Sequence, residues 1–153
     1  MVCTLLALLA GFAFALPTRL TERLIDPYSP YYVEREVRDT AEWVQGMMRR
    51  ALLEQRDFVF ELYGSKPNPC IRAKWTNPSE TIEWRSDRIS YRVKRTGSVT
   101  PEQFHYSHRY QTMSPAFEFM VFAQTPDDNA TKQTEWSIVI SLYGLVRLCK
   151  EEK

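Results

Sequence analysis

The stretch VEREVRDTAEWVQGMMRRALLEQRDFVFEL, residues 33–62, contains the point at which the hydrophobic period of the chain changes. Apolar side chains first recur every three or four residues, as they do along one face of a helix. After Asp57 they alternate with polar ones, as on a strand with one buried face. The sequence therefore predicts an amphipathic helix over residues 31–56 that runs directly into a β domain.

This helix carries its apolar residues in one stripe and most of its charges on the opposite face. Pro30 suits the first helical turn, where the N–H that proline lacks would have no partner. A helix with one apolar face must bury that face, and the sheet that follows is the available partner. The stripe consists of Val33, Val37, Ala41, Val44, Met48, Ala51 and Leu52.

The rest of the chain consists of short alternating segments separated by turn sequences such as KPNPC (66–70), TNPSE (76–80) and TPDDNATKQ (125–133). Short strands at close spacing with turn signals between them are typical of antiparallel sheet. The strands are expected at 58–63, 71–75, 82–84, 89–93, 105–112, 117–123, 136–142 and 145–149.

The N-terminal stretch MVCTLLALLAGFAFALP, residues 1–17, has no charged side chain. As a helix, residues 2–16 would span roughly 22 Å, which is shorter than a bilayer core of about 30 Å. Ala13-Phe14-Ala15 resembles a small-x-small signal-peptidase site. The leader is therefore either a cleaved signal sequence or a membrane segment that is retained.

Composition limits the function classes. The 153 residues carry a formal net charge of +1, which gives no long-range attraction to nucleic acid or anionic lipid. No glycine loop that would cradle phosphate and no metal-ligand cluster is recognisable. His105 and His108 are interpreted as polar strand residues. The sequence predicts no catalytic residue, no metal ion and no cofactor.

Three cysteines are present, of which Cys3 lies in the leader. If the chain is exported, Cys70 and Cys149 are the candidates for a disulfide, which on the loop-entropy model would stabilise the fold by about 4–5 kcal/mol. In a reducing compartment both would remain free thiols. The leader favours export and hence the disulfide.

The order of these segments resembles a type IV pilin-like protein. Residues 1–17 match the apolar helix that follows the Gly-Phe-Thr-Leu-x-Glu motif of prepilins, which would lie upstream of Met1. Residues 33–62 resemble the helix of the H-type minor pseudopilins of type II secretion and of the related FimT minor pilins.

The C-terminal segment IVISLYGLVRLC, residues 138–149, is also similar to this family, which often ends in a strand followed by a Gly-Arg-x-Arg-like motif. Gly144, Val146 and Arg147 match the motif, and Leu145 stands where the family has an arginine. In FimT-like proteins of competence systems, basic residues of this motif are implicated in DNA binding. With Leu145 in place, DNA binding is not the expected function of this chain.

The resemblance implies an α+β fold in which an N-terminal membrane-inserting helix continues into an amphipathic helix packed on an antiparallel β-sandwich. It divides the chain into an apolar transmembrane or fibre-core segment (1–17), a kinked amphipathic helix (18–56) and an antiparallel β domain (57–153). The membrane or fibre-core residues would be Leu5, Leu6, Ala7, Leu8, Leu9, Ala10, Gly11, Phe12, Ala13, Phe14, Ala15, Leu16 and Pro17.

The implied function is that of a minor pilin or pseudopilin in type II secretion or type IV pilus assembly, without catalysis, at the start or tip of the fibre. The implied partners are other pilin or pseudopilin subunits, the inner-membrane assembly platform and, if the full-length N-terminus exists, the prepilin peptidase. The implied location is the bacterial inner membrane, crossed once, with the β domain on the extracytoplasmic side. The alternatives are a secreted β-rich binding module cleaved near Ala15 and, third, a small exported enzyme.

Overall fold

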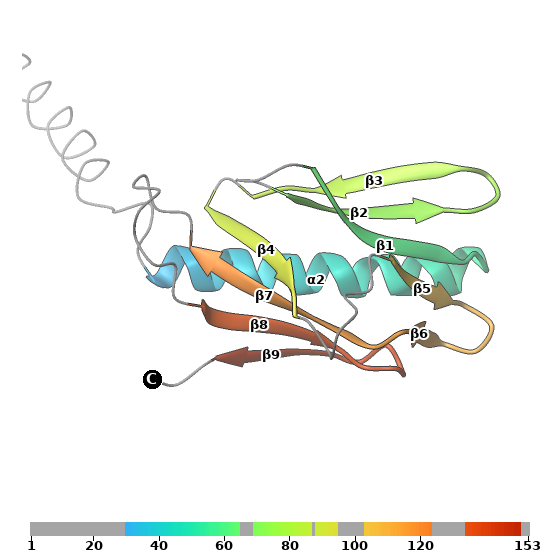
Figure 1. The fold of residues 1–153 in the computed structure, drawn as a ribbon. Coiled ribbons are helices and arrows are strands. Elements are labelled where there is room, and N and C mark those ends of the chain that lie inside the picture. The colour runs from blue at the N-terminus through green and yellow to red at the C-terminus, as the bar shows by residue number, and fades with distance from the viewer. Residues whose placement is uncertain (1–29, 65–68, 87, 95–102, 124–133, 151–153) are drawn as a thin grey trace, which may run out of the picture.

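The computed structural model describes residues 30–64, 69–86, 88–94, 103–123 and 134–150. Within these residues one helix, α2 (Pro30–Glu54), packs beside two antiparallel sheets (Figure 1). The first sheet has the strand order β3-β2-β1-β5-β6, and the second has the order β4-β7-β8-β9. The strands are β1 (Phe58–Tyr63), β2 (Cys70–Trp75), β3 (Glu80–Trp84), β4 (Ile89–Val93), β5 (Gln103–Ser107), β6 (Thr112–Ser114), β7 (Phe117–Ala123), β8 (Thr134–Ile140) and β9 (Val146–Lys150).

Helix α2 ends where the backbone of Gln55 adopts a left-handed conformation, with φ of 54°. The N–H of Arg56 then donates to the carbonyl oxygen of Ala51 at 3.0 Å. This is the Schellman arrangement, which supplies a partner to a carbonyl group that the end of the helix leaves free. The helix predicted over residues 31–56 is thus observed at Pro30–Glu54.

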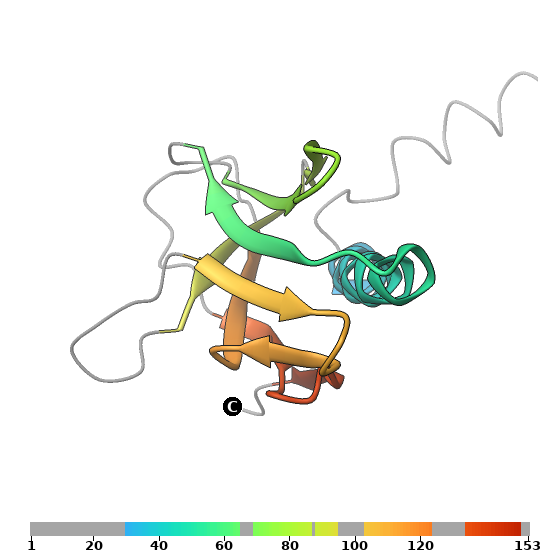
Figure 2. The same cartoon turned by 90° about the vertical axis from the view of Figure 1, so that its right-hand side faces the viewer.

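The apolar stripe of α2 is buried against both sheets from Val33 to Ala51, whereas Leu52 at its end is 39% exposed. Val37, Val44 and Ala51 are fully buried, and each buried side chain of the size of valine contributes about 1.5–3 kcal/mol. One flank of the helix faces β3, where the ring of Trp43 stacks on that of Trp84 with centroids 5.8 Å apart. Another flank contacts β9. Figure 2 shows the helix from its end, lying beside the two sheets.

Aromatic side chains join the two sheets across the core. Phe104 of β5 and Phe117 of β7 stack with ring centroids 3.7 Å apart, and Phe60 of β1 meets Phe117 edge-on at 6.4 Å. All three side chains are buried. Offset and edge-to-face aromatic pairs stabilise a fold by about 0.5–1.5 kcal/mol beyond their burial. The sheets and α2 therefore share one core.

The predicted fold class was wrong. The described chain is mostly β, with two antiparallel sheets and a single helix of 25 residues, and the long N-terminal helix of the prediction is not part of it. No helix within these ranges has both the length and the apolar character needed to cross a membrane. Helix α2 lacks this character because charged residues recur along its outer face. Residues 1–17, where the membrane-inserting part was expected, lie outside the described residues.

The strand predicted over residues 105–112 is also corrected. Strand β5 ends at Ser107, and the chain turns back through residues 108–111 into β6. Gln111 makes this reversal possible by adopting a positive φ of 53°. No glycine or proline marks this turn in the sequence, and the segment was therefore predicted as one strand.

Candidate functional site

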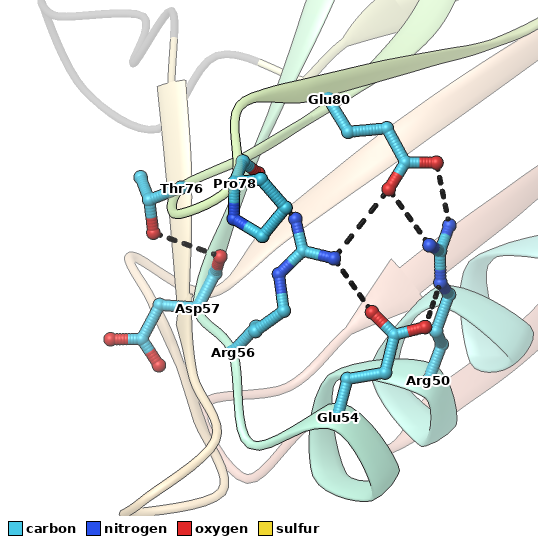
Figure 3. A network of polar contacts seen from close by, with 7 residues as sticks. All are labelled: Arg50, Glu54, Arg56, Asp57, Thr76, Pro78 and Glu80. Atoms are coloured by element: carbon cyan, nitrogen blue, oxygen red, sulfur yellow. Dashed lines mark hydrogen bonds and ion pairs between the residues drawn. The ribbon is translucent and has the colours of Figure 1, made fainter.

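An ionic network joins the last turns of α2 and the adjoining Arg56 to the β2–β3 turn and the first residue of β3 (Figure 3). The guanidinium group of Arg50 donates to both carboxylate oxygens of Glu80, at 3.1 and 2.7 Å, and to Oε1 of Glu54 at 2.6 Å. Arg56 donates to Oε2 of Glu54 at 2.7 Å and to the carbonyl oxygen of Pro78. All four charged side chains are therefore paired with one another.

The network has a structural role and acts as a clamp between the helix and the first sheet. Hydrogen bonds from Arg50 hold the pKa values of Glu80 and Glu54 below the ordinary value for glutamate. The guanidinium groups of Arg50 and Arg56 also lie 4.9 and 5.1 Å from the ring centroid of Trp75. Carboxylates held ionised in this way are poor proton donors at neutral pH. We interpret the network as the fastening of the β2–β3 turn to the helix.

A second pair connects the residue before β1 with the turn after β5. Both the backbone N–H of His108, at 2.8 Å, and its Nδ1, at 2.7 Å, contact Oδ1 of Asp57. Burial tends to raise the pKa of Asp57, but the bonds from His108 outweigh it and the pKa is lowered. Asp57 is the single polar partner of His108 among the described residues. The pair therefore lacks the nucleophile that a hydrolytic triad requires.

The outer face of the first sheet carries a row of cross-strand charges. Glu61 of β1 is buried, and its carboxylate contacts Lys74 at 2.7 Å, Gln103 at 3.3 Å and Arg72 at 3.5 Å. Arg72 also pairs with Glu83 of β3 at 2.6 Å. Opposite charges on neighbouring strands stabilise a sheet. Because these charges compensate one another, we interpret the row as a stabilising feature of the sheet.

A buried group of hydroxyls joins α2 to both sheets. The hydroxyl of Tyr91 in β4 and that of Thr40 lie 2.8 Å apart, and the indole N–H of Trp84 donates to Thr40 at 2.9 Å and to Tyr91 at 3.2 Å. Burial raises the pKa of Tyr91 to about 12, so it stays a neutral phenol. These contacts satisfy buried polar atoms and have a structural role.

Metal binding finds no support in the part of the chain that the structure describes. No group of three or more His, Cys, Asp or Glu side chains within those ranges is placed so that it could hold a metal ion.

The turn between β8 and β9 differs from these networks because it presents apolar rather than charged side chains. Gly144 adopts a φ of 70°, and its N–H donates to the carbonyl oxygen of Ser141 at 2.9 Å. A Cβ atom at Gly144 would lie 3.3 Å from the Sδ atom of Met48 and 3.4 Å from the ring of Tyr106. Both the backbone conformation and the close approach therefore favour glycine here.

This turn is held in place although its side chains face solvent. The N–H of Met113 in β6 donates to the carbonyl oxygen of Leu142 at 2.7 Å, which fastens the turn to the β5–β6 hairpin. The side chain of Tyr143 is 80% exposed, and Leu142 and Leu145 are about half exposed. Three apolar side chains are thus presented to solvent on a fixed turn.

Further exposed apolar residues lie at the same end of the molecule. The C-terminal turn of α2, the β5–β6 turn and the β8–β9 turn gather there, as Figures 1 and 2 show. Eight large apolar side chains are exposed in the described residues, and six belong to these three segments. The other two, Tyr31 and Tyr63, lie at the start of α2 and at the end of β1. We call the six the apolar end: Leu52, Leu53, Tyr110, Leu142, Tyr143 and Leu145.

Comparisons with protein-family models, with curated proteins and with solved structures give no match. The choice of a candidate site therefore depends on geometry alone, and the geometry favours the apolar end. Scattered exposed leucines are ordinary, but exposed apolar residues that cluster and are rimmed by polar ones mark interaction surfaces.

The residues predicted for the C-terminal family motif build part of this site. Gly144 forms the β8–β9 turn, while Val146 and Arg147 begin β9, the first half-buried and the second exposed. The leader residues 5–17 lie outside the described ranges. The sequence placed Leu142 and Leu145 in strands, so their exposure at the turn was missed. The signal that was available is Tyr143-Gly144 with a leucine on each side.

Cys70 and Cys149, the predicted disulfide pair, are not bonded to each other in the structure, where both are free thiols. Cys70 is buried in β2 of the first sheet, whereas Cys149 is exposed on β9 of the second. The two residues are thus on strands of different sheets, and their side chains differ in exposure. Burial raises the pKa of the Cys70 thiol, which makes it an unreactive structural cysteine.

Proposed function

We propose that this chain is a non-catalytic subunit of a pilus- or pseudopilus-type assembly that binds its neighbours through the apolar end. The observation that carries the proposal is the gathering of six exposed apolar side chains on three fixed segments at one end of the body. A subunit that works by docking needs a surface of this kind and no reactive group.

Two further features support an assembly role. The titratable groups of the networks described above are engaged in ion pairs or hydrogen bonds that stabilise the fold. The order of the sequence, an apolar leader followed by an amphipathic helix and antiparallel strands, resembles that of minor pilins and pseudopilins. The partners proposed are other subunits of this type and the inner-membrane assembly platform.

The proposed location is the bacterial inner membrane or the fibre, with the folded body on the extracytoplasmic side. The prepilin peptidase would be a further partner if the native chain carries a processing motif ahead of residue 1. This part of the proposal rests on residues 1–17, which lie outside the described ranges.

One structural observation favours a second candidate, a β-rich binding module released after cleavage near Ala15. From Val33 to Ala51 the stripe of α2 is buried within the same core as the two sheets, so the described residues contain a core of their own. A body of this kind can function without a membrane segment, and the apolar end would serve it equally as a binding surface.

The N-terminus and intact mass of the native protein, isolated from cell envelopes, separate these candidates. A chain that begins with a methylated residue ahead of the apolar leader is the result expected for a pilin-type subunit. A mature chain that begins near Leu16 would contradict the assembly proposal and support the secreted module.

A further inference from the structure

We propose that the apolar end docks on an acidic surface of a neighbouring protein subunit. This inference rests on the proposed function and adds the chemistry of the partner: apolar contact at the centre, and carboxylates of the partner against arginines of this chain at the rim.

The charge that remains uncompensated around the apolar end is positive. Arg49 of α2, Arg109 of the β5–β6 turn and Arg147 of β9 are exposed. None of the three has an ion pair within the described residues, although Arg109 lies over the ring of its neighbour Tyr110 at 5.8 Å.

The carboxylates on the same side of the molecule are already engaged. Glu54 and Glu80 are paired with Arg50 and Arg56, and Asp57 accepts a hydrogen bond from the backbone N–H of His108. A partner that covers this end must therefore supply the negative charge itself. Complementary charge at the rim of an interface speeds encounter and fixes orientation.

The side chains favour a protein partner over a nucleic acid. Four of the six residues of the apolar end are leucines, and leucine offers no face on which a base can stack. The other two are Tyr110 and Tyr143, and tyrosine and arginine are the residue types enriched at protein interfaces.

A second copy of this chain fits the surface less well, because docking end to end would bring the three arginines of each copy against like charges.

Site-specific photocrosslinking in the native cells tests this inference. The full chain carries p-benzoylphenylalanine in place of Tyr143, and a matched strain carries it in place of Tyr63, an exposed tyrosine away from the apolar end. Mass spectrometry then identifies the crosslinked peptides. We expect a protein crosslink from position 143 to a surface that contains Asp or Glu beside apolar residues, and no crosslink to that surface from position 63.

Charge reversal makes the test specific for the acidic rim. Arg147→Glu should lower the yield of the crosslink from position 143 about tenfold, as expected for an opposed charge pair at an interface. Arg35→Glu, at an exposed position near the start of α2, is the control and should leave the yield unchanged. Reversal of the contacted carboxylate on the partner to Lys should restore the yield with Arg147→Glu.

Crosslinks from position 143 to nucleic acid, to lipid, to a second copy or to a surface rich in Lys and Arg would overturn the inference, as would no crosslink at all. The outcome is separable from that of the proposed function. A chain that begins near Leu16 but crosslinks to an acidic surface would refute the assembly role and retain the acidic partner. A chain with a pilin-type N-terminus and no such crosslink would overturn this inference alone.

Discussion

Replacement of Gly144 by Ala should destabilise the protein by about 2 kcal/mol. The residue has a φ of 70°, and a left-handed backbone costs an L-residue roughly 1–2 kcal/mol. The new Cβ atom would also lie 3.3 Å from Sδ of Met48 and 3.4 Å from the ring of Tyr106, so those side chains must shift. Gly46 supplies the matched control, because a Cβ atom there meets nothing within 4 Å. Gly46→Ala lies in the interior of α2 and should stabilise the protein by about 1 kcal/mol.

Urea unfolding of the purified full chain, followed by tryptophan fluorescence, measures both variants against the wild type. The two substitutions add the same methyl group, and we expect their free energies of unfolding to differ by about 3 kcal/mol, with unchanged dependence on urea concentration. If Gly144→Ala is as stable as the wild type, the β8–β9 turn does not have the described conformation. The apolar end would then lack the fixed turn that presents three of its six side chains.

Three further predictions concern titration and reactivity. Because burial raises the pKa of Tyr91 to about 12, alkaline difference spectroscopy should show a tyrosine that ionises near that pH and is lost in Tyr91→Phe. The hydrogen bond from Arg50 lowers the pKa of Glu80 in the folded state. The ionised carboxylate of Glu80 therefore stabilises the protein above the ordinary pKa of about 4.5. This stabilisation is lost as the pH falls through the lowered pKa. Urea midpoints in acid should therefore fall less for Glu80→Gln than for the wild type, and equal losses would contradict the clamp. In the native protein, Cys149 should react at once with a maleimide, and Cys70 should react only after unfolding. If neither cysteine reacts until the protein is reduced, the two are joined in a disulfide.

The change of hydrophobic period in the sequence predicted most of the observed secondary structure. Helix α2 and the strands Phe58–Tyr63, Ile89–Val93 and Phe117–Ala123 lie where alternating or helical spacing predicted them. Such periodicity reports which face of a segment is buried, and that is a local property. The hairpin at residues 108–111 was not predicted, because its reversal depends on a positive φ at a glutamine rather than on a glycine.

The partition of the strands into two sheets could not be read from the sequence, because strand order depends on contacts between segments far apart in the chain. For the same reason, the pairing of Asp57 with His108 and of Arg50 with Glu80 was not foreseen. The disulfide between Cys70 and Cys149 was predicted by elimination, and the sequence could not show that the two cysteines lie on strands of different sheets. The apolar end was missed because its residues come from three separate segments.

If the proposed function is right, another protein covers the apolar end in the cell. Hydroxyl-radical footprinting of the full chain, purified and in native cell envelopes, measures this coverage. Tyr110 and Tyr143 should be oxidised readily in the purified chain and protected in the envelopes, while Tyr31 and Tyr63 report on exposure elsewhere. Equal oxidation of Tyr110 and Tyr143 in both preparations, with Tyr31 and Tyr63 also unchanged, would show that no partner covers the apolar end.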